Sequence, residues 1–252
     1  MLHIFLAALL ATSALAAPSA TGQWPNFEPC SVNSPDFKTC AKNNIQLALK
    51  EFSGGIPVLG VPSFDPLYLS EVLVDYKQDG VEGKMLIKNT TSYGIKKAEV
   101  LDIRTNLSDP SNMAIDVDFR MPSVFIEGQY KAEGKIVAFP ISGKGVFNNS
   151  LTDVRGTWGL RGDLVTIDGE EYMKIRHVYM YPEVGDMKVY ASNLFTGNEE
   201  LNKAALRFAN LYWPAFYKEL LPFVAESWDS FMREFLNKFF LKVPFKTIFP
   251  EN

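Results

Sequence analysis

Histidine and cysteine are scarce in this sequence of 252 residues, which contains two of each. The histidines are His3 and His177, and the cysteines are Cys30 and Cys40. A structural zinc site usually takes four thiolate or imidazole ligands, which this chain cannot easily supply. The spacing of the cysteines also excludes a C-x-x-C redox motif. We therefore expect no metal and no other cofactor.

The sequence lacks the short motifs of common enzyme classes. It has no G-x-S-x-G elbow, no H-E-x-x-H pair and no phosphate loop, and the glycines of residues 143–145 fit neither nucleotide fingerprint. Asp116 and Asp118 are two residues apart on a predicted strand, so both point to the same side. We interpret them as part of a solvated face and not as a catalytic dyad. The expected set of catalytic residues is empty, and we do not expect an enzyme.

Positive charge is not in excess, because the sequence has 25 lysines and arginines and 29 acidic residues, giving a net charge of −4. Without a basic block, nucleic acid is not an expected partner.

The most apolar C-terminal window still contains Arg207, Lys218 and Glu219. Each such charge costs about 2.5–3.5 kcal/mol at the centre of a membrane span. We therefore predict no stable membrane insertion.

Residues 1–17 have the pattern of a secretory signal peptide, a short apolar run that ends in small residues. The run is too short to cross a bilayer. We expect cleavage after Ala16 or Ala17. The sequence thus predicts a secreted, extracellular protein with a single domain over residues 18–252.

Export has two consequences for the mature chain. In an oxidising compartment Cys30 and Cys40 are the one available pair, so we predict a disulfide between them. Three N-x-[S/T] sequons also predict surface glycosylation sites at Asn89, Asn106 and Asn148.

The rest of the chain is organised around residues 198–241, which have the pattern of a long helix. Asn198 is a candidate N-cap, and Thr196 is an alternative that would begin a capping box. Pro214 and Pro222 predict kinks or breaks. The middle of the stretch is apolar nearly all round, so the helix must be enclosed on most sides.

Before that helix, the sequence alternates with period two over many segments, so that each predicted strand has one apolar and one charged face. A shorter helix precedes the strands, from Ser34 to Gly54. A one-sided antiparallel sheet needs a cover for its apolar face. The C-terminal helix is the one predicted element large enough. We predict an α+β fold in which a highly curved antiparallel sheet rolls around it.

The alternation assigns a set of residues to the inner face of this sheet: Val117, Phe119, Val124, Ile126, Tyr130, Met173, Ile175, His177 and Tyr179. On the helix, Phe208, Tyr212 and Phe216 are core residues by default. Two members are polar. His177 could be a core histidine bonded to backbone or a contact for a ligand head group. A buried Tyr130 hydroxyl needs a partner, which a ligand oxygen or a water could be.

Several segments carry a family resemblance: the pair Cys30 and Cys40, GIPVLGVPSFDPLYL at residues 55–69, G-x-Y followed by GKIVAFPISGKG within residues 128–145, NLFTGNEEL at residues 193–201, and Ile248-Phe249-Pro250. Their order and spacing resemble the takeout and juvenile hormone binding protein family of insects, over the whole mature chain. A single obvious cysteine pair is more similar to the takeout branch. The resemblance implies a TULIP-like super-roll with an elongated hydrophobic tunnel, lined by the inner set above.

The resemblance also implies an extracellular carrier of a small lipophilic ligand, such as a juvenile hormone-like terpenoid, a fatty acid, a quinone or an odorant. We expect the carrier to be a monomer. Two alternatives remain open from the residues. One is a secreted esterase that acts on lipophilic esters through His177. The other is a signalling protein that uses its outer face and has a filled core without a ligand cavity.

Overall fold

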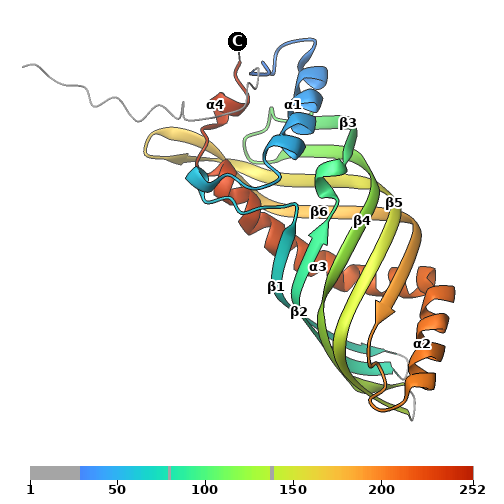
Figure 1. Cartoon of the computed structure of the whole chain (residues 1–252). Coiled ribbons are helices and arrows are strands. Elements are labelled where there is room, and N and C mark those ends of the chain that lie inside the picture. The colour runs from blue at the N-terminus through green and yellow to red at the C-terminus, as the bar shows by residue number, and fades with distance from the viewer. Residues whose placement is uncertain (1–28, 79–80, 137–138, 252) are drawn as a thin grey trace, which may run out of the picture.

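The computed structural model describes residues 29–78, 81–136 and 139–251 (Figure 1). In chain order the elements are α1 (Phe37–Glu51), η1 (Pro57–Leu59), β1 (Leu67–Gln78), β2 (Val81–Tyr93), η2 (Ile95–Lys97), β3 (Glu99–Asn106), β4 (Met113–Ile136), β5 (Phe139–Ile167), β6 (Glu170–Ala191), α2 (Glu199–Leu211), α3 (Trp213–Phe240) and α4 (Phe245–Ile248). The predicted signal peptide, residues 1–17, lies outside the described residues.

The strands form one antiparallel sheet in the order β1-β2-β4-β5-β6, with β3 paired to the end of β4. Strands β4, β5 and β6 are 24, 29 and 22 residues long, several times the usual strand length of about 5–6 residues. Strands of this length twist and coil. The sheet curls into an open roll with α1 at one end and α2 at the other, and α3 runs between them (Figure 1). The predicted curved sheet is confirmed.

A crease shared by β4 and β5 bends the sheet. Met121 and Val124 are three residues apart, yet both belong to one apolar cluster, and Leu151 and Val154 of β5 pack in that cluster too. Residues three apart on a regular strand point to opposite faces. Asp153, between the two β5 residues, has a φ of 49°. The crease keeps apolar side chains on the inside of both strands while the strands change direction.

Helices α2 and α3 run antiparallel to β6 along the edge of the sheet. The side-chain amide of Asn210 bonds both to the N–H and to the carbonyl of Val189, each at 2.8 Å. Asn237 bonds in the same way to Ile175, each at 2.9 Å. The helical path between the asparagines is about 40 Å, close to the roughly 46 Å of strand between their partners. The helices therefore follow the strand over most of its length.

Two further side chains complete this contact between the helices and the sheet edge. The Val178 N–H donates to Asp229 at 2.7 Å, and the Tyr217 hydroxyl donates to the Pro182 carbonyl at 3.0 Å. An uncovered edge strand presents unpaired backbone groups to other chains. Here side chains of the helices satisfy many of those groups.

The apolar core is densest at the α1 end of the roll. Residues of α1, β3, β4, β6 and the C-terminal segment form one buried cluster, against which the second half of α3 packs. Phe119 stacks on Trp158 with ring centroids 4.1 Å apart. Phe235 of α3 meets Phe64, just before β1, with centroids 6.5 Å apart. The segment just before β1 and the last strand, β6, therefore both reach α3 at this end.

The expected helix-end signals are partly confirmed. Asn198 is the N-cap of α2, and its side chain accepts a hydrogen bond from the Leu201 N–H at 2.9 Å. The helix breaks at Tyr212, where α2 gives way to α3 and Pro214 occupies the first turn. Pro222 lies inside α3, which continues through it, so of the two expected outcomes the break does not occur there and a kink stays a prediction.

The predicted disulfide is confirmed. Cys30 and Cys40 are bonded, with their Cα atoms 5.7 Å apart, which ties the N-terminal segment to α1. The same segment also meets the C-terminus, because the Val32 N–H donates to the Pro250 carbonyl at 2.9 Å. The first helix, predicted from Ser34, begins at Phe37, with Asp36 in the N-cap position. Among the helices of the described residues, none is long and apolar enough to span a bilayer.

Candidate ligand-binding interior

Cross-strand ion pairs mark the outer face of the sheet, the side away from α1 and α3. They include Lys84–Asp75, Lys88–Glu71, Arg104–Asp118, Arg120–Asp153, Arg161–Asp116 and Arg176–Asp163. Pairs of this kind order the surface and contribute little energy each. By contrast, the buried polar or charged residues of the described chain are Asp65, Thr90 and Ser92, and they include no lysine or arginine.

Asp116 and Asp118 belong to this outer face, as predicted. Arg104 and Thr157 donate hydrogen bonds to Asp118, and the Arg104 guanidinium is the main cause that lowers the pKa of Asp118 to about 2. Burial raises the pKa of Asp116, but hydrogen bonds from Arg161 and Tyr179 outweigh it and lower the pKa overall. Each carboxylate is thus held ionised by its own cation. Two such groups do not make an acid–base pair.

Four of the predicted inner residues lie in the packed core. Val117, Phe119, Met173 and Ile175 are all buried, with exposed fractions of 4%, 0%, 0% and 1%. They belong to the two apolar clusters at and near the α1 end. Their inner-face position is confirmed, and their role in ligand binding stays a prediction.

Val124, Ile126 and Tyr130 also point inward, further toward the α2 end. Val124 and Tyr130 are buried, and Ile126 is half-buried. The Tyr130 hydroxyl donates to the Ser192 carbonyl at 2.6 Å, and burial raises the pKa of this phenol. The hydroxyl hydrogen is thus bonded to the segment that leads from β6 into α2, and a ligand contact of Tyr130 stays a prediction.

A β-bulge in β6 changes which of its residues face inward. Arg161 pairs with His177, but the next residue, Gly162, pairs with Ile175, which leaves Arg176 as an extra residue in β6. One inserted residue reverses the alternation of everything beyond it. Ile175 and Val178 are consequently both buried although they are three residues apart.

The bulge overturns the predicted inner position of His177 and Tyr179. The His177 side chain is 68% exposed. The Tyr179 hydroxyl donates to Asp116 on the outer face at 3.0 Å, and its ring lies under the Arg161 guanidinium. Period-two counting across an unrecognised bulge assigns residues to the wrong face, and the sequence carries no clear signal for this one.

His177 contacts α3 rather than a nucleophile. Its Nδ1 lies 3.2 Å from Asp229 Oδ2, while the other oxygen of that carboxylate accepts the Val178 N–H. No serine, threonine or cysteine hydrogen-bonds to His177 in the described part of the chain. The histidine therefore belongs to the contact between α3 and the edge of β6.

The predicted core position of Phe208, Tyr212 and Phe216 is wrong. They form a stripe of mutually contacting rings on α2 and early α3, with Phe208 and Tyr212 centroids 4.7 Å apart, and Phe208 is 55% exposed. Three exposed leucines extend the stripe: Leu201, Leu211 and Leu220. The apolar all-round pattern predicts enclosure of the whole helix, but the packed core encloses the second half of α3 and leaves this first part open.

Sequence reasoning missed two polar residues of the interior. Asn149 pairs with Ile126 and Val189, so its side chain shares their inner face. Its Oδ1 is buried and without a hydrogen-bond partner in the described structure, and the same holds for Nε1 of Trp228 on α3. Buried polar atoms usually have partners. A polar residue at an inward position of an apolar strand is the signal that could have identified Asn149.

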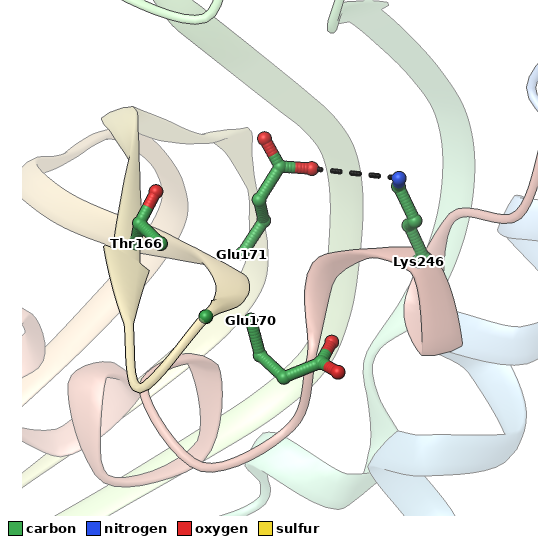
Figure 2. Close-up of a pocket in the computed structure, with 5 residues that line it drawn as sticks. Thr166, Glu170, Glu171 and Lys246 are labelled. Carbon is green, nitrogen blue, oxygen red and sulfur yellow. Dashed lines mark ion pairs between the residues drawn. The ribbon is translucent and has the colours of Figure 1, made fainter.

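A cavity of about 350 Å³ lies between the β5–β6 turn and α4, at the end of the molecule away from α2. Its lining is polar and comprises Thr166, Gly169, Glu170, Glu171 and Lys246. Figure 2 shows Glu171 directed toward Lys246, with which it pairs at 3.7 Å. Such a lining does not suit an apolar chain.

The described residues contain no group of three or more histidine, cysteine, aspartate or glutamate side chains able to hold a metal ion.

The structure offers two kinds of surface to a lipophilic molecule. One is the uncharged inner face of β1, β2 and β4–β6 opposite α3, and the other is the exposed apolar stripe of α2 and early α3.

Comparisons with known proteins agree with the predicted resemblance. The family described as haemolymph juvenile hormone binding protein (JHBP) matches residues 5–250. Circadian clock-controlled protein daywake of Drosophila yakuba is 20% identical over 219 residues, covering 84% of each chain, and daywake of Drosophila melanogaster gives the same values.

The fold has a counterpart among solved structures. The crystal structure of Epiphyas postvittana takeout 1 superposes with a TM-score of 0.75 and 25% sequence identity. The superposition covers 88% of this chain and 99% of that chain. The curled antiparallel sheet with its helices is thus a known architecture, and the elongated tunnel stays a prediction.

Proposed function

The chain belongs to the haemolymph juvenile hormone binding protein family, and we propose that it is a secreted carrier that holds a small lipophilic molecule against the inner face of its sheet. The observation that carries this proposal is the separation of charge. The ion pairs between β4 and its neighbouring strands lie on the outer face, and no lysine or arginine is buried in the described chain. Such an interior favours apolar chains over charged ones.

The ligand would be a terpenoid related to juvenile hormone, a fatty acid, a quinone or an odorant. Burying about ten CH₂ groups at ~0.8 kcal/mol each gives roughly 8 kcal/mol, which corresponds to micromolar affinity. Because the inner face is uncharged, binding should depend little on salt. The residues proposed to contact ligand are those that face inward near the α2 end, Val124, Ile126 and the ring of Tyr130.

An esterase is a poorer fit. His177, which that mechanism requires, is exposed at the contact between α3 and the edge of β6, where its Nδ1 lies 3.2 Å from Asp229. It does not belong to the apolar inner surface where a lipophilic ester would bind, and no serine, threonine or cysteine of the described residues hydrogen-bonds to it. We infer a binding protein rather than an enzyme.

Secretion of a single domain, residues 18–252, is part of the proposal and is supported by the disulfide, a bond typical of exported proteins. The sequons are also compatible with export. Asn89 and Asn106 are exposed, and Asn148 is half-buried on the outer face. The Asn89 side chain bonds to Tyr68 and Gln129, so a glycan there would replace the Gln129 contact.

Native mass spectrometry of the protein purified from culture medium tests the proposal. A carrier retains a lipid, so a fraction of the molecules should have a discrete mass increment that organic extraction removes. Titration of the extracted protein with tritiated lipids should then give micromolar or tighter binding that is unchanged between low and high NaCl. Protein that is consistently empty and binds no lipid would rule out the carrier.

A further inference from the structure

Asn149 is a polar residue with apolar neighbours on both adjacent strands. Its cross-strand neighbours on the inner face are Ile126 and Val189, and the residues two before and two after it on β5 are Phe147 and Leu151. Its Oδ1 is buried and has no hydrogen-bond partner among the described residues. The amide oxygen therefore makes no hydrogen bond that stabilises the fold.

A buried amide oxygen without a hydrogen-bond partner is costly for the protein that carries it. A buried polar group without a hydrogen bond keeps the full cost of its desolvation. An apolar group of the same shape at that position would not have this cost. Asn149 is thus better explained by a partner outside the protein chain than by stability. The amide can donate and accept, and it carries no charge.

Trp228 presents a second unpartnered polar atom, on the opposite wall. It precedes by four and seven residues Met232 and Phe235, which pack into the interior, so it shares their face of α3. Its Nε1 is buried and without an acceptor in the described structure. An indole N–H can only donate, so its missing partner is an oxygen such as a carbonyl, ester or hydroxyl group.

The two groups are separate contact points along the roll. Asn149 lies beside Val189, whereas the residue after Trp228 is bonded to Val178. Eleven strand residues separate these two positions of β6, roughly 36 Å of strand. A single small head group could contact one of them, and a longer molecule could approach both.

Resting on the proposed carrier function, we propose that Asn149 and Trp228 select ligands whose polar groups are uncharged, such as long-chain alcohols, esters and ketones, over ionised fatty acids. The interior supplies two neutral hydrogen-bonding groups. A carboxylate there would be desolvated without a counter-ion, because no lysine or arginine is buried in the described chain.

Binding of tritiated hexadecanol and palmitate to the full mature protein at pH 7.5 tests the selection. The wild type should bind hexadecanol at least about 10-fold more tightly than palmitate. Asn149→Leu and Trp228→Phe should each weaken binding of hydrogen-bonding lipids by about 3- to 10-fold. The single hydroxyl of hexadecanol need not contact both Asn149 and Trp228. An ester and a ketone of the same length are therefore tested as well.

Stability separates this role from a structural one. Because Asn149 Oδ1 has no partner among the described residues, the urea midpoint of Asn149→Leu should equal or exceed that of the wild type. Trp228→Phe also removes part of a packed ring and should lower the midpoint for that reason, so the stability test is made on Asn149→Leu. Asn149→Ser, which shortens the side chain, gives a second test of binding. The matched control is Asn148→Leu, which changes the neighbouring residue on the outer face and should change no affinity. All proteins are produced in a bacterial periplasm, so that the wild type has no glycan at Asn148.

Palmitate that binds as tightly as the alcohol would overturn the proposal, as would unchanged affinity of all the interior variants. A large loss of stability in Asn149→Leu would assign that residue a structural role and would also count against it. If the wild type binds none of the lipids, the carrier function itself fails, which is a different result from binding without selection.

Discussion

Asn237 of α3 bonds to both backbone groups of Ile175 in β6, accepting from its N–H and donating to its carbonyl, each at 2.9 Å. A primary amide has the same donor and acceptor as a peptide group, so Asn237 replaces the neighbour that an edge strand lacks. Asn210 repeats this arrangement at Val189. The two asparagines fix the helices along the sheet edge, and so fix the position of the wall that faces the inner surface.

Replacing Asn237 by leucine should therefore destabilise the protein. The change leaves the N–H and carbonyl of Ile175 unpaired in a partly buried setting, which costs about 1–3 kcal/mol. Urea unfolding measures the loss. Asn43, exposed on α1, supplies the control, because Asn43→Leu should change stability by less than about 0.5 kcal/mol. Equal effects of the two variants would show that the edge contact does not hold the helix.

The two kinds of aromatic residue should respond differently to truncation. Phe119 is fully buried against Trp158, so Phe119→Ala should cost about 3–5 kcal/mol. Phe208 is 55% exposed, so Phe208→Ala should cost about 1 kcal/mol or less. Thermal unfolding of both variants checks the difference. A large loss for Phe208→Ala would mean that the stripe on α2 is covered in solution.

Much of the fold could be predicted from the sequence, because hydrophobic periodicity and helix-end chemistry are local signals. The alternation around Val117 and Phe119, the cap at Asn198 and the break near Pro214 all follow from neighbouring residues. The inner position of His177 could not be obtained in this way. One extra residue at Arg176 reverses the strand, and that insertion is decided by pairing with β5 rather than by the local sequence.

The candidate site was less predictable than the fold. The sequence identifies polar residues on an apolar face, but it does not show whether each has a partner. The sequence does not show, for example, that the Tyr130 hydroxyl donates to the Ser192 carbonyl. Asn149 and Trp228 differ from it by their unsatisfied atoms, which is a property of three-dimensional packing alone.

Acid should remove a defined part of the stability through Asp118. The pKa of this carboxylate is lowered to about 2 by Arg104, from about 3.9 in an unfolded chain. A lowered folded-state pKa adds stability that is fully present above about pH 4 and is lost as the pH falls toward 2. Urea unfolding between pH 7 and pH 2.5 should show Asp118→Asn losing less stability on acidification than the wild type. Parallel pH curves would contradict this role.

Removing the disulfide should loosen the N-terminal segment. Cys30 and Cys40 are ten residues apart, and opening a loop of this size costs about 3 kcal/mol in the loop-entropy model. The double variant Cys30→Ser with Cys40→Ser should therefore have a lower unfolding midpoint than the wild type. Added reductant should lower the wild-type midpoint toward that value and leave the double variant unchanged. A wild type insensitive to reductant would argue against a stabilising bond.

Photocrosslinking with a long-chain alcohol that carries a diazirine along its chain, followed by peptide mapping, tests the central claim most directly, because it reports where the ligand lies. Labels should fall on inward-facing residues of β4, β5 and β6 near Ile126, Asn149 and Val189, and excess unlabelled hexadecanol should prevent them. Labels confined to the exposed stripe around Phe208 and Leu211, or labels that competitor does not reduce, would contradict an interior binding site.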